Sequence, residues 1–186
     1  GAAVSLVERQ GTALREQNQG LKAQLNDIIE IARANEGLIR RVHELSLDLL
    51  RCTSLAALAT VLESRLRAEF GADRVVLRVF GTAPAAAAEF VATADAPERT
   101  AFAEALSTRV PSCGRLARAQ HEAVFGEPDA AVGSAVVLPL ADAAWSGLLL
   151  IASRDATRFQ PGLGLELLTF LAAVATLAMA VWVRPS

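Results

Sequence analysis

Two apolar runs decide the fold: Gly133-Ser-Ala-Val-Val-Leu-Pro-Leu140 and Gly147-Leu-Leu-Leu-Ile-Ala-Ser153. Each is short, aliphatic and bounded by turn-forming residues, which is typical of a buried β-strand. The six residues from Ala141 to Ser146 suit a hairpin connection between them. Because Pro139 donates no ladder hydrogen bond, we expect its part of the strand at an edge or a bulge. The two runs therefore predict an antiparallel hairpin at the centre of the fold.

Two further strand patterns precede this hairpin. Arg74 to Phe80 is rich in β-branched residues, and Glu89 to Thr93 is predicted as a short second strand in a meander with the first. Side chains alternate between the two faces of a strand. In the first of these strands the faces carry Val75, Leu77 and Val79 on one side and Val76, Arg78 and Phe80 on the other. Both faces are apolar enough to be covered.

Helical patterns surround the strands. Leu55 to Phe70 is amphipathic, with Thr53 or Ser54 as its N-cap and Gly71 as a left-handed stop. The chain breaks at Pro111-Ser-Cys-Gly114, and Gly126 ends the second of the cover segments. Two later helices are expected, Pro97 to Leu106 and a last helix after Pro161, and Leu116 to Phe125 is expected as another short helix or an irregular cover. The order of elements predicts an α+β fold with a central antiparallel sheet, the terminal helices on one face and the crossover segments on the other.

The first 50 residues read as one long helix. Val4 to Arg51 contains no proline and three glycines. Apolar and small residues recur at alternating spacings of three and four, the repeat of a helix that packs against a partner helix. The full seam is Leu14, Asn18, Leu21, Leu25, Ile28, Ala32, Asn35, Ile39, Val42, Ser46 and Leu49.

This seam predicts a coiled-coil-type helix that pairs with a second copy of the chain. The residues expected in the homodimer contact are Leu21, Leu25, Ile28, Ala32, Asn35, Ile39 and Val42. Two interpretations are open for Asn18 and Asn35: they set the register of the pair, or they face solvent where the helix drifts from the seam. The predicted organisation is a dimerisation helix over residues 1–52 and a domain over residues 53–186.

The last helix raises the question of a membrane. Leu163 to Val183 is long enough to span a bilayer, but Glu166 lies within it and alanine dominates its second half. We favour a buried helix that packs beside the last turns of the first helix, Val42 to Leu49. We accordingly expect no membrane span.

Charge and cysteine content bound the function. The net charge is −2, and the first helix carries acidic and basic residues in balance, which argues against a nucleic-acid partner. Cys52 and Cys113 are far apart and form no CxxC pair, and no secretion signal is visible at the start. We expect a cytoplasmic protein with two free thiols.

No convincing catalytic or metal-binding pattern is found. Cys113 lies near Arg115, Arg118 and His121, which would suit a thiol of lowered pKa, but further metal ligands do not follow at sensible spacing. A small thiol beside a surface histidine is the favoured interpretation. The segments around Gly162-Leu-Gly164 and Ser134 lack the phosphate-loop and nucleophile-elbow contexts. We expect no enzyme and no metal.

Arg78 and Trp145 each have two open interpretations. Arg78 either points into a cavity, where it would neutralise an anionic ligand, or points outward as a solvated residue or the partner of a helix carboxylate. The outward orientation is favoured. Trp145 is either an exposed contact or a cover for the end of the sheet.

The order of these strings resembles a GAF domain, and more specifically the bacterial DUF484 family of GAF-like proteins. The resemblance spans essentially the whole chain. The hairpin from Gly133-Ser134 through Pro139-Leu140, the following Gly147 strand and Arg158-Phe159 carry the GAF likeness. The family strings are Val4-Ser-Leu-Val-Glu-Arg-Gln10, Ala34-Asn35-Glu36, Cys113-Gly114 and Phe125-Gly126.

The resemblance implies a sensory or regulatory module that binds a small molecule between sheet and helical cover and signals along its helices. The ligand, and any cofactor, stay unidentified. Two departures count against particular ligands: the Asn-Lys-Phe-Asp-Glu-type motif of cyclic-nucleotide-binding relatives is absent, and Cys113 lacks the Cys-His pair of bilin attachment.

We expect the ligand pocket beneath residues 97–126. The pocket residues expected there are Arg78, Phe90, Phe102, Cys113 and Phe125. The alternative is a non-enzymatic interaction scaffold whose pocket is filled by the three phenylalanines.

Overall fold

The computed structural model describes residues 2–81, 89–93, 95–126, 132–160 and 164–183. The chain forms two units by its internal contacts, residues 1–41 and residues 42–186. The boundary lies at residue 41 rather than at the expected residue 52. The physical reason is that Val42, Leu45 and Leu49 at the end of the first helix are buried in the core of the second unit.

The long first helix is confirmed: α1 runs from Ala2 to Arg51. Every side chain from Thr12 to Glu36 is exposed. The apolar seam residues are among them, with Leu21 57% and Ile28 62% exposed. In residues 8–36, where the structure describes the side chains, the apolar seam residues are therefore not buried by any contact within the chain.

Helix α2 (Leu55–Phe70) begins and ends as the sequence predicts. Ser54 rather than Thr53 is its N-cap, because the Ser54 hydroxyl accepts a hydrogen bond of 3.1 Å from the Ala57 backbone N–H. Gly71 follows the helix with φ of 69°, a left-handed conformation that favours glycine. Leu55, Leu58, Leu62 and Leu66 form its buried stripe.

In the residues that the structure describes, the sheet has five strands in the order β2-β1-β5-β4-β3. Its centre is the expected hairpin, in which β4 (Ser134–Ala141) pairs antiparallel with β5 (Ser146–Ser153). Strand β1 (Arg74–Phe80) pairs antiparallel with the other side of β5. Trp145, in the hairpin turn, is 7% exposed and covers the end of the sheet. A Cβ at Gly147 would lie 2.6 Å from the Arg78 carbonyl oxygen and 3.1 Å from the Trp145 ring, so only glycine fits beneath this indole.

The outer strands correct two expectations. Strand β2 (Val91–Ala92) pairs with β1 in parallel, so the two do not form a meander. Ten residues separate the two strands, which is more than a tight hairpin turn contains. The sequence therefore does not determine whether the second strand runs parallel or antiparallel to the first. Strand β3 (Ser112–Gly114), expected only as a chain break, pairs with β4 from Ala135 to Val137. Pro139 lies beyond these pairs, at the edge position that its missing N–H requires.

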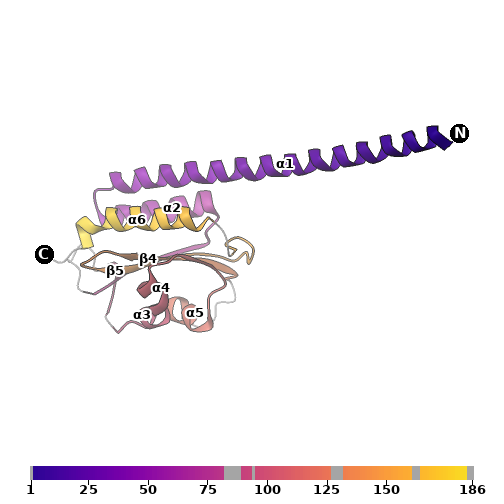
Figure 1. Cartoon of the computed structure of the whole chain (residues 1–186). Coiled ribbons are helices and arrows are strands. Elements are labelled where there is room, and N and C mark those ends of the chain that lie inside the picture. The colour runs from indigo at the N-terminus through magenta and orange to yellow at the C-terminus, as the bar shows by residue number, and fades with distance from the viewer. Residues whose placement is uncertain (1, 82–88, 94, 127–131, 161–163, 184–186) are drawn as a thin grey trace. The chain divides into compact units, whose positions relative to one another are not determined.

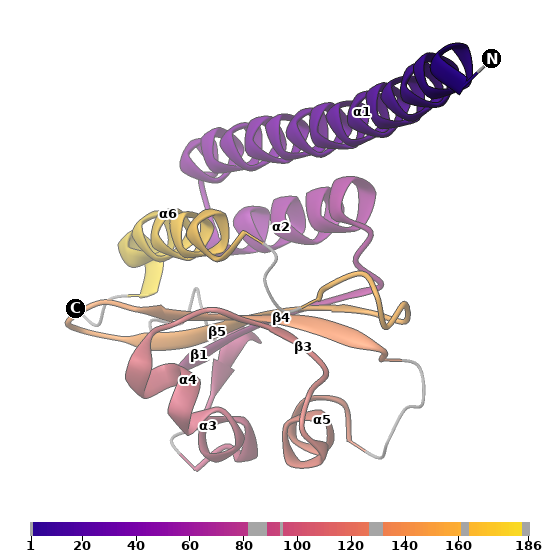
Figure 2. The same cartoon turned by 45° about the vertical axis from the view of Figure 1, so that its right-hand side comes forward.

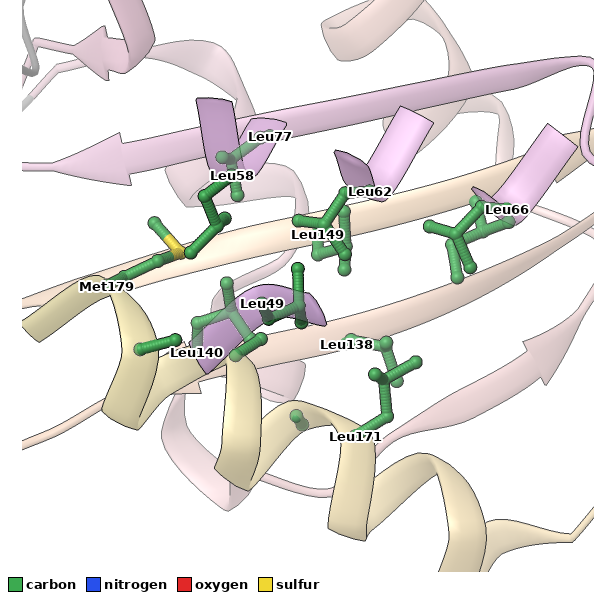
Figure 3. Close-up of a cluster of buried hydrophobic side chains, with 14 of the residues drawn as sticks. Leu49, Leu58, Leu62, Leu66, Leu77, Leu138, Leu140, Leu149, Leu171 and Met179 are labelled. Carbon is green, nitrogen blue, oxygen red and sulfur yellow. The ribbon is translucent and has the colours of Figure 1, made fainter. Parts of the chain in front are cut away.

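One face of the sheet carries the terminal helices. Figures 1 and 2 show α2 and α6 (Leu165–Val183) side by side on this face. Figure 3 shows the core between them and the sheet, where Leu49, Leu58 and Leu62 meet leucines of β1, β4 and β5. The expected contact between residues 42–49 and the last helix is therefore present in one continuous cluster.

The other face carries the cover segments. Helices α3 (Pro97–Ala101), α4 (Ala103–Thr108) and α5 (Arg118–Phe125) lie there (Figure 2). The expected helix over 97–106 is broken at Phe102 into α3 and α4. The predicted alternation of β1 is confirmed, since Val79 packs with the terminal helices and Phe80 with the cover.

Helix α6 is buried on one side only. Leu171, Ala175 and Met179 are buried, whereas Leu177 and Val181 are 66% and 80% exposed. By length and composition α6 is apolar enough to cross a membrane, and 39% of its apolar 18-residue stretch is buried inside the structure. The expectation of a buried helix thus holds for the side that faces the sheet.

Candidate functional site

The five expected pocket residues do not lie together. Phe102 and Phe125 belong to the cluster beneath the cover helices. Phe90 and Cys113 pack against the cluster on the opposite face of the sheet, under the terminal helices. All five were expected beneath residues 97–126, but of the four apolar ones the structure places only Phe102 and Phe125 there.

The sheet face beneath the cover is packed with side chains, and a hollow of about 530 Å³ lies between α3 and α5 in the cover itself. Phe102 is 1% exposed, and Leu148 and Leu150 on β5 are fully buried below it. Phe80, Ala135 and Val137 complete this surface, with Phe125 packed partly against it. Among the residues that the structure describes, the face that a ligand would use is packed as a second hydrophobic core.

Arg78 pairs with a helix carboxylate at the edge of this core. Its Nε donates to Oε1 of Glu98 on α3 at 3.2 Å, and its Nη1 donates to the Leu77 carbonyl oxygen at 3.1 Å. Glu98 is a buried residue, 8% exposed, so the guanidinium compensates a carboxylate that would otherwise be costly to desolvate. Arg78 is therefore the partner of a helix carboxylate, as one interpretation expected, but its side chain faces the cover and not outward as favoured.

Arg78 also lines a small hollow beside Phe90. This hollow has a volume of about 230 Å³ and lies between α2 and β1. Its other lining residues are Ala59, Leu62, Glu63, Val75, Val76, Leu77 and Glu89. It brings two of the expected ligand residues together, on a different side of the domain from the expected one.

The environment of Cys113 disfavours its thiolate, which is the nucleophilic form of the side chain. Burial raises the pKa of the Cys113 thiol above its usual value. Arg118, one of the nearby cations, pairs with Glu122, and the His121 ring lies 5.3 Å from that of Phe125. Within the residues described, no group of three or more His, Cys, Asp or Glu side chains could hold a metal ion.

Two features were missed in the sequence. The first is a groove of about 330 Å³ between α6 and the open end of β4, lined by Pro111, Pro139 and the small residues Ala172, Ala173 and Thr176. The second is an ionic cluster in which Arg65 on α2 binds Asp48 near the end of α1 at 2.7 Å and also contacts Glu69. The small residues on one side of α6 were the available signal for the groove, whereas nothing in the spacing of residues 48 and 65 indicates their contact.

The fold defines a class: an α+β module whose mainly antiparallel sheet has helices on both faces and is preceded by a long N-terminal helix. The chain belongs to the DUF484 family, because the model of that family, described as a protein of unknown function, matches residues 1–184.

The comparison with solved structures finds two that are similar to this chain. They are the phycoerythrobilin-bound and the phycocyanobilin-bound GAF domains of a cyanobacterial phytochrome. Each is 18% identical and matches over 78% of this chain and 92% of its own, with TM-scores of 0.46 and 0.44. No curated protein matches the chain.

Proposed function

We propose that this chain is a non-enzymatic regulatory module that dimerises through its first helix and acts as an interaction scaffold. The observation that carries the proposal is the contrast between two surfaces. The face beneath the cover, where a ligand would bind, is filled by Phe102, Leu148 and Leu150. The first helix, in contrast, presents a long apolar stripe to solvent.

The stripe supports pairing between copies. Leu14, Leu21, Leu25, Ile28 and Ile39 are each at least 44% exposed and all lie on the expected seam. Solvent exposure of such a stripe costs about 25 cal/mol per Å² relative to burial against a partner. Val42, which we expected on the seam, is 2% exposed in the domain's own core, so the proposed contact ends at Ile39.

A matched pair of alanines tests the seam. Ala32 lies on it, and Ala23 lies nine residues earlier, half a turn away from the stripe at 100° per residue. Ala32→Glu buries a carboxylate in the apolar seam and should raise the dissociation constant of the dimer at least tenfold. Ala23→Glu adds the same charge on the opposite side and should leave it unchanged. Equal effects in sedimentation equilibrium would reject the seam.

The small-ligand sensor is the second candidate, because Arg78 and Phe90 share one hollow. In this case a ligand would bind between α2 and β1 and compete with Glu98 for the guanidinium. Native mass spectrometry of protein purified from cells tests it. A retained small mass that disappears in Arg78→Met would favour the sensor, and a chain without added mass would count against it.

A further inference from the structure

The groove between α6 and β4 lies where one edge of the sheet is incomplete. Strand β3 has three residues and pairs with β4 from Ala135 to Val137. Beyond Val137, in the part of the chain that the structure describes, no strand pairs with this side of β4. Pro139 and Ala141 line the groove along this stretch. The groove is therefore bounded on one side by an open strand edge.

The backbone groups of this edge face away from the rest of the sheet. The Asp142 N–H donates to the Trp145 carbonyl oxygen at 3.1 Å, so the even-numbered residues of β4 bond with β5. The odd-numbered residues face the other way, as their pairing with β3 requires. The carbonyl oxygen of Pro139 and both backbone groups of Ala141 thus point to the open edge. These are the groups with which an added strand forms hydrogen bonds.

The groove is mainly apolar and carries two polar side chains that lack a protein partner within the described residues. The Thr176 hydroxyl forms no hydrogen bond there, whereas that of Thr169 donates back to its own helix at 2.7 Å. The exposed Arg109 guanidinium forms no ion pair or hydrogen bond there. Asp142, the other charged lining residue, accepts two backbone N–H groups of the hairpin turn. The charge that the groove offers to a ligand is therefore positive.

We propose that this groove binds a short, extended, acidic peptide segment of a partner protein as an added strand beside β4. The proposal rests on the proposed scaffold role and does not involve the pairing of the first helix. A peptide residue opposite Ala141 exchanges two backbone hydrogen bonds with it, and a residue two positions along donates to the Pro139 carbonyl oxygen. An acidic side chain toward β3 meets Arg109, whose guanidinium forms strong charge-assisted hydrogen bonds with a carboxylate.

The lining determines the length and the character of the segment. Pro139 has no N–H, and a proline at an edge opposes pairing with a long strand. The site therefore suits about three residues, which span about 10 Å at about 3.4 Å per residue. The small side chains of Ala172, Ala173 and Ala180 leave a groove of about 330 Å³ for the peptide side chains that face α6, and Leu177, 66% exposed, offers an apolar contact. Small or β-branched apolar side chains beside the acidic one fit this lining.

Selection of a phage-displayed library of random linear peptides on the full-length protein tests the proposal. Enriched peptides should carry an acidic residue beside small or β-branched apolar ones. Arg109→Asn should weaken the binding of the synthesised peptides at least tenfold in fluorescence polarisation. Asparagine suits this position because residue 109 has a left-handed backbone with φ of 56°. Arg115→Asn removes an exposed arginine outside the groove lining and should leave the affinity unchanged.

Two further variants test the backbone bonds and the groove separately. Ala141→Pro removes only an N–H that faces the open edge, and Pro139 shows that β4 accommodates proline at a position of the same orientation. This variant should bind the peptides at least tenfold more weakly while its circular dichroism spectrum stays unchanged. Ala173→Trp fills the groove from the exposed side of α6 and should have the same effect. Ala68→Trp, at an exposed position on α2, is its control.

The outcomes separate this site from the pairing of the first helix. Absence of enrichment, enriched peptides without a carboxylate, or unchanged binding to Arg109→Asn and Ala141→Pro would overturn the proposal. Absence of enrichment together with a dimer weakened by Ala173→Trp would overturn it and assign the groove to a second copy of the chain. Ala32→Glu should leave peptide binding unchanged, so a failure of the proposed dimer is distinguished from a failure of this site.

Discussion

Arg78 and Glu98 join the sheet to the helical cover through a partly buried ion pair. The Glu98 side chain is 11% exposed and that of Arg78 is 34% exposed, so solvent screens the pair only in part. Such a pair fixes the position of α3 more than it adds net stability, because desolvation offsets the attraction. Removing one partner is nevertheless costly, since the other stays desolvated.

Glu98→Gln is expected to destabilise the fold by about 1–2 kcal/mol, because the amide leaves the guanidinium charge without its counter-ion. Urea unfolding followed by circular dichroism measures the change. Glu104→Gln, which neutralises an exposed carboxylate on α4, is the control and should stay within about 0.5 kcal/mol of the wild type. Equal effects of the two substitutions would show that the pair has no structural role.

Both cysteines should react slowly as long as the protein is folded. Burial raises the pKa of the Cys113 thiol, and burial together with the nearby Asp48 carboxylate raises that of Cys52. At neutral pH the reactive thiolate is therefore scarcer than for a free cysteine. Alkylation by iodoacetamide, measured by peptide mass spectrometry, should accelerate at both sites on unfolding in urea. Much faster reaction of Cys113 than of Cys52 in the folded protein would instead support an activated nucleophile.

At the scale of elements, the local sequence pattern predicts the long strands, whereas the short strands depend on the neighbouring strands with which they pair. Strands β1, β4 and β5 each have seven or eight residues, enough for alternation and turn residues to define them. Strands β2 and β3 have two and three residues, and their pairing depends on where β1 and β4 present an open edge. The same limit explains the site: Phe90 and Cys113 lie in or beside these short strands, so the sequence could not show which face they occupy.

The N-cap of α2 offers a matched test between neighbouring residues. Ser54→Ala removes the hydroxyl that accepts from Ala57 and should destabilise the protein by about 1 kcal/mol. Thr53→Ala removes a hydroxyl one residue earlier and should have a much smaller effect on the urea midpoint. A larger loss for Thr53→Ala would show that the helix begins one residue earlier.

Asp73 links the start of β1 to the end of β5 and should make stability depend on acid pH. Its carboxylate accepts hydrogen bonds from the Arg154 N–H at 2.7 Å and the Ser153 hydroxyl at 3.1 Å. These bonds hold the pKa of Asp73 below its usual value of 3.8, with Arg154 and Arg67 nearby as cations. The stabilisation is therefore complete above pH 3.8 and is lost as the pH falls through the lower folded-state pKa.

Asp73→Asn should accordingly lower the melting temperature at pH 7, and the difference from the wild type should shrink below pH 3.8. Asp95→Asn, a change at another exposed carboxylate, is the control. A difference that grows on acidification would contradict the assigned role of Asp73.

At the scale of the whole molecule, apolar surface is distributed unevenly between the inside and the outside of the protein. Both faces of the sheet are packed, one under α2 and α6 and the other under the cover helices. The remaining exposed hydrophobic residues of the described chain lie almost entirely on α1 and α6. This distribution favours a protein that acts by contact between helices over one that encloses a ligand beneath its cover.

Native mass spectrometry of the full chain purified from cells tests this account most directly. Compared with the denatured mass, the protein should appear at twice the mass of one chain with no added small molecule. A monomer at micromolar concentration would contradict pairing through the first helix, and a retained small molecule would contradict the filled, ligand-free domain.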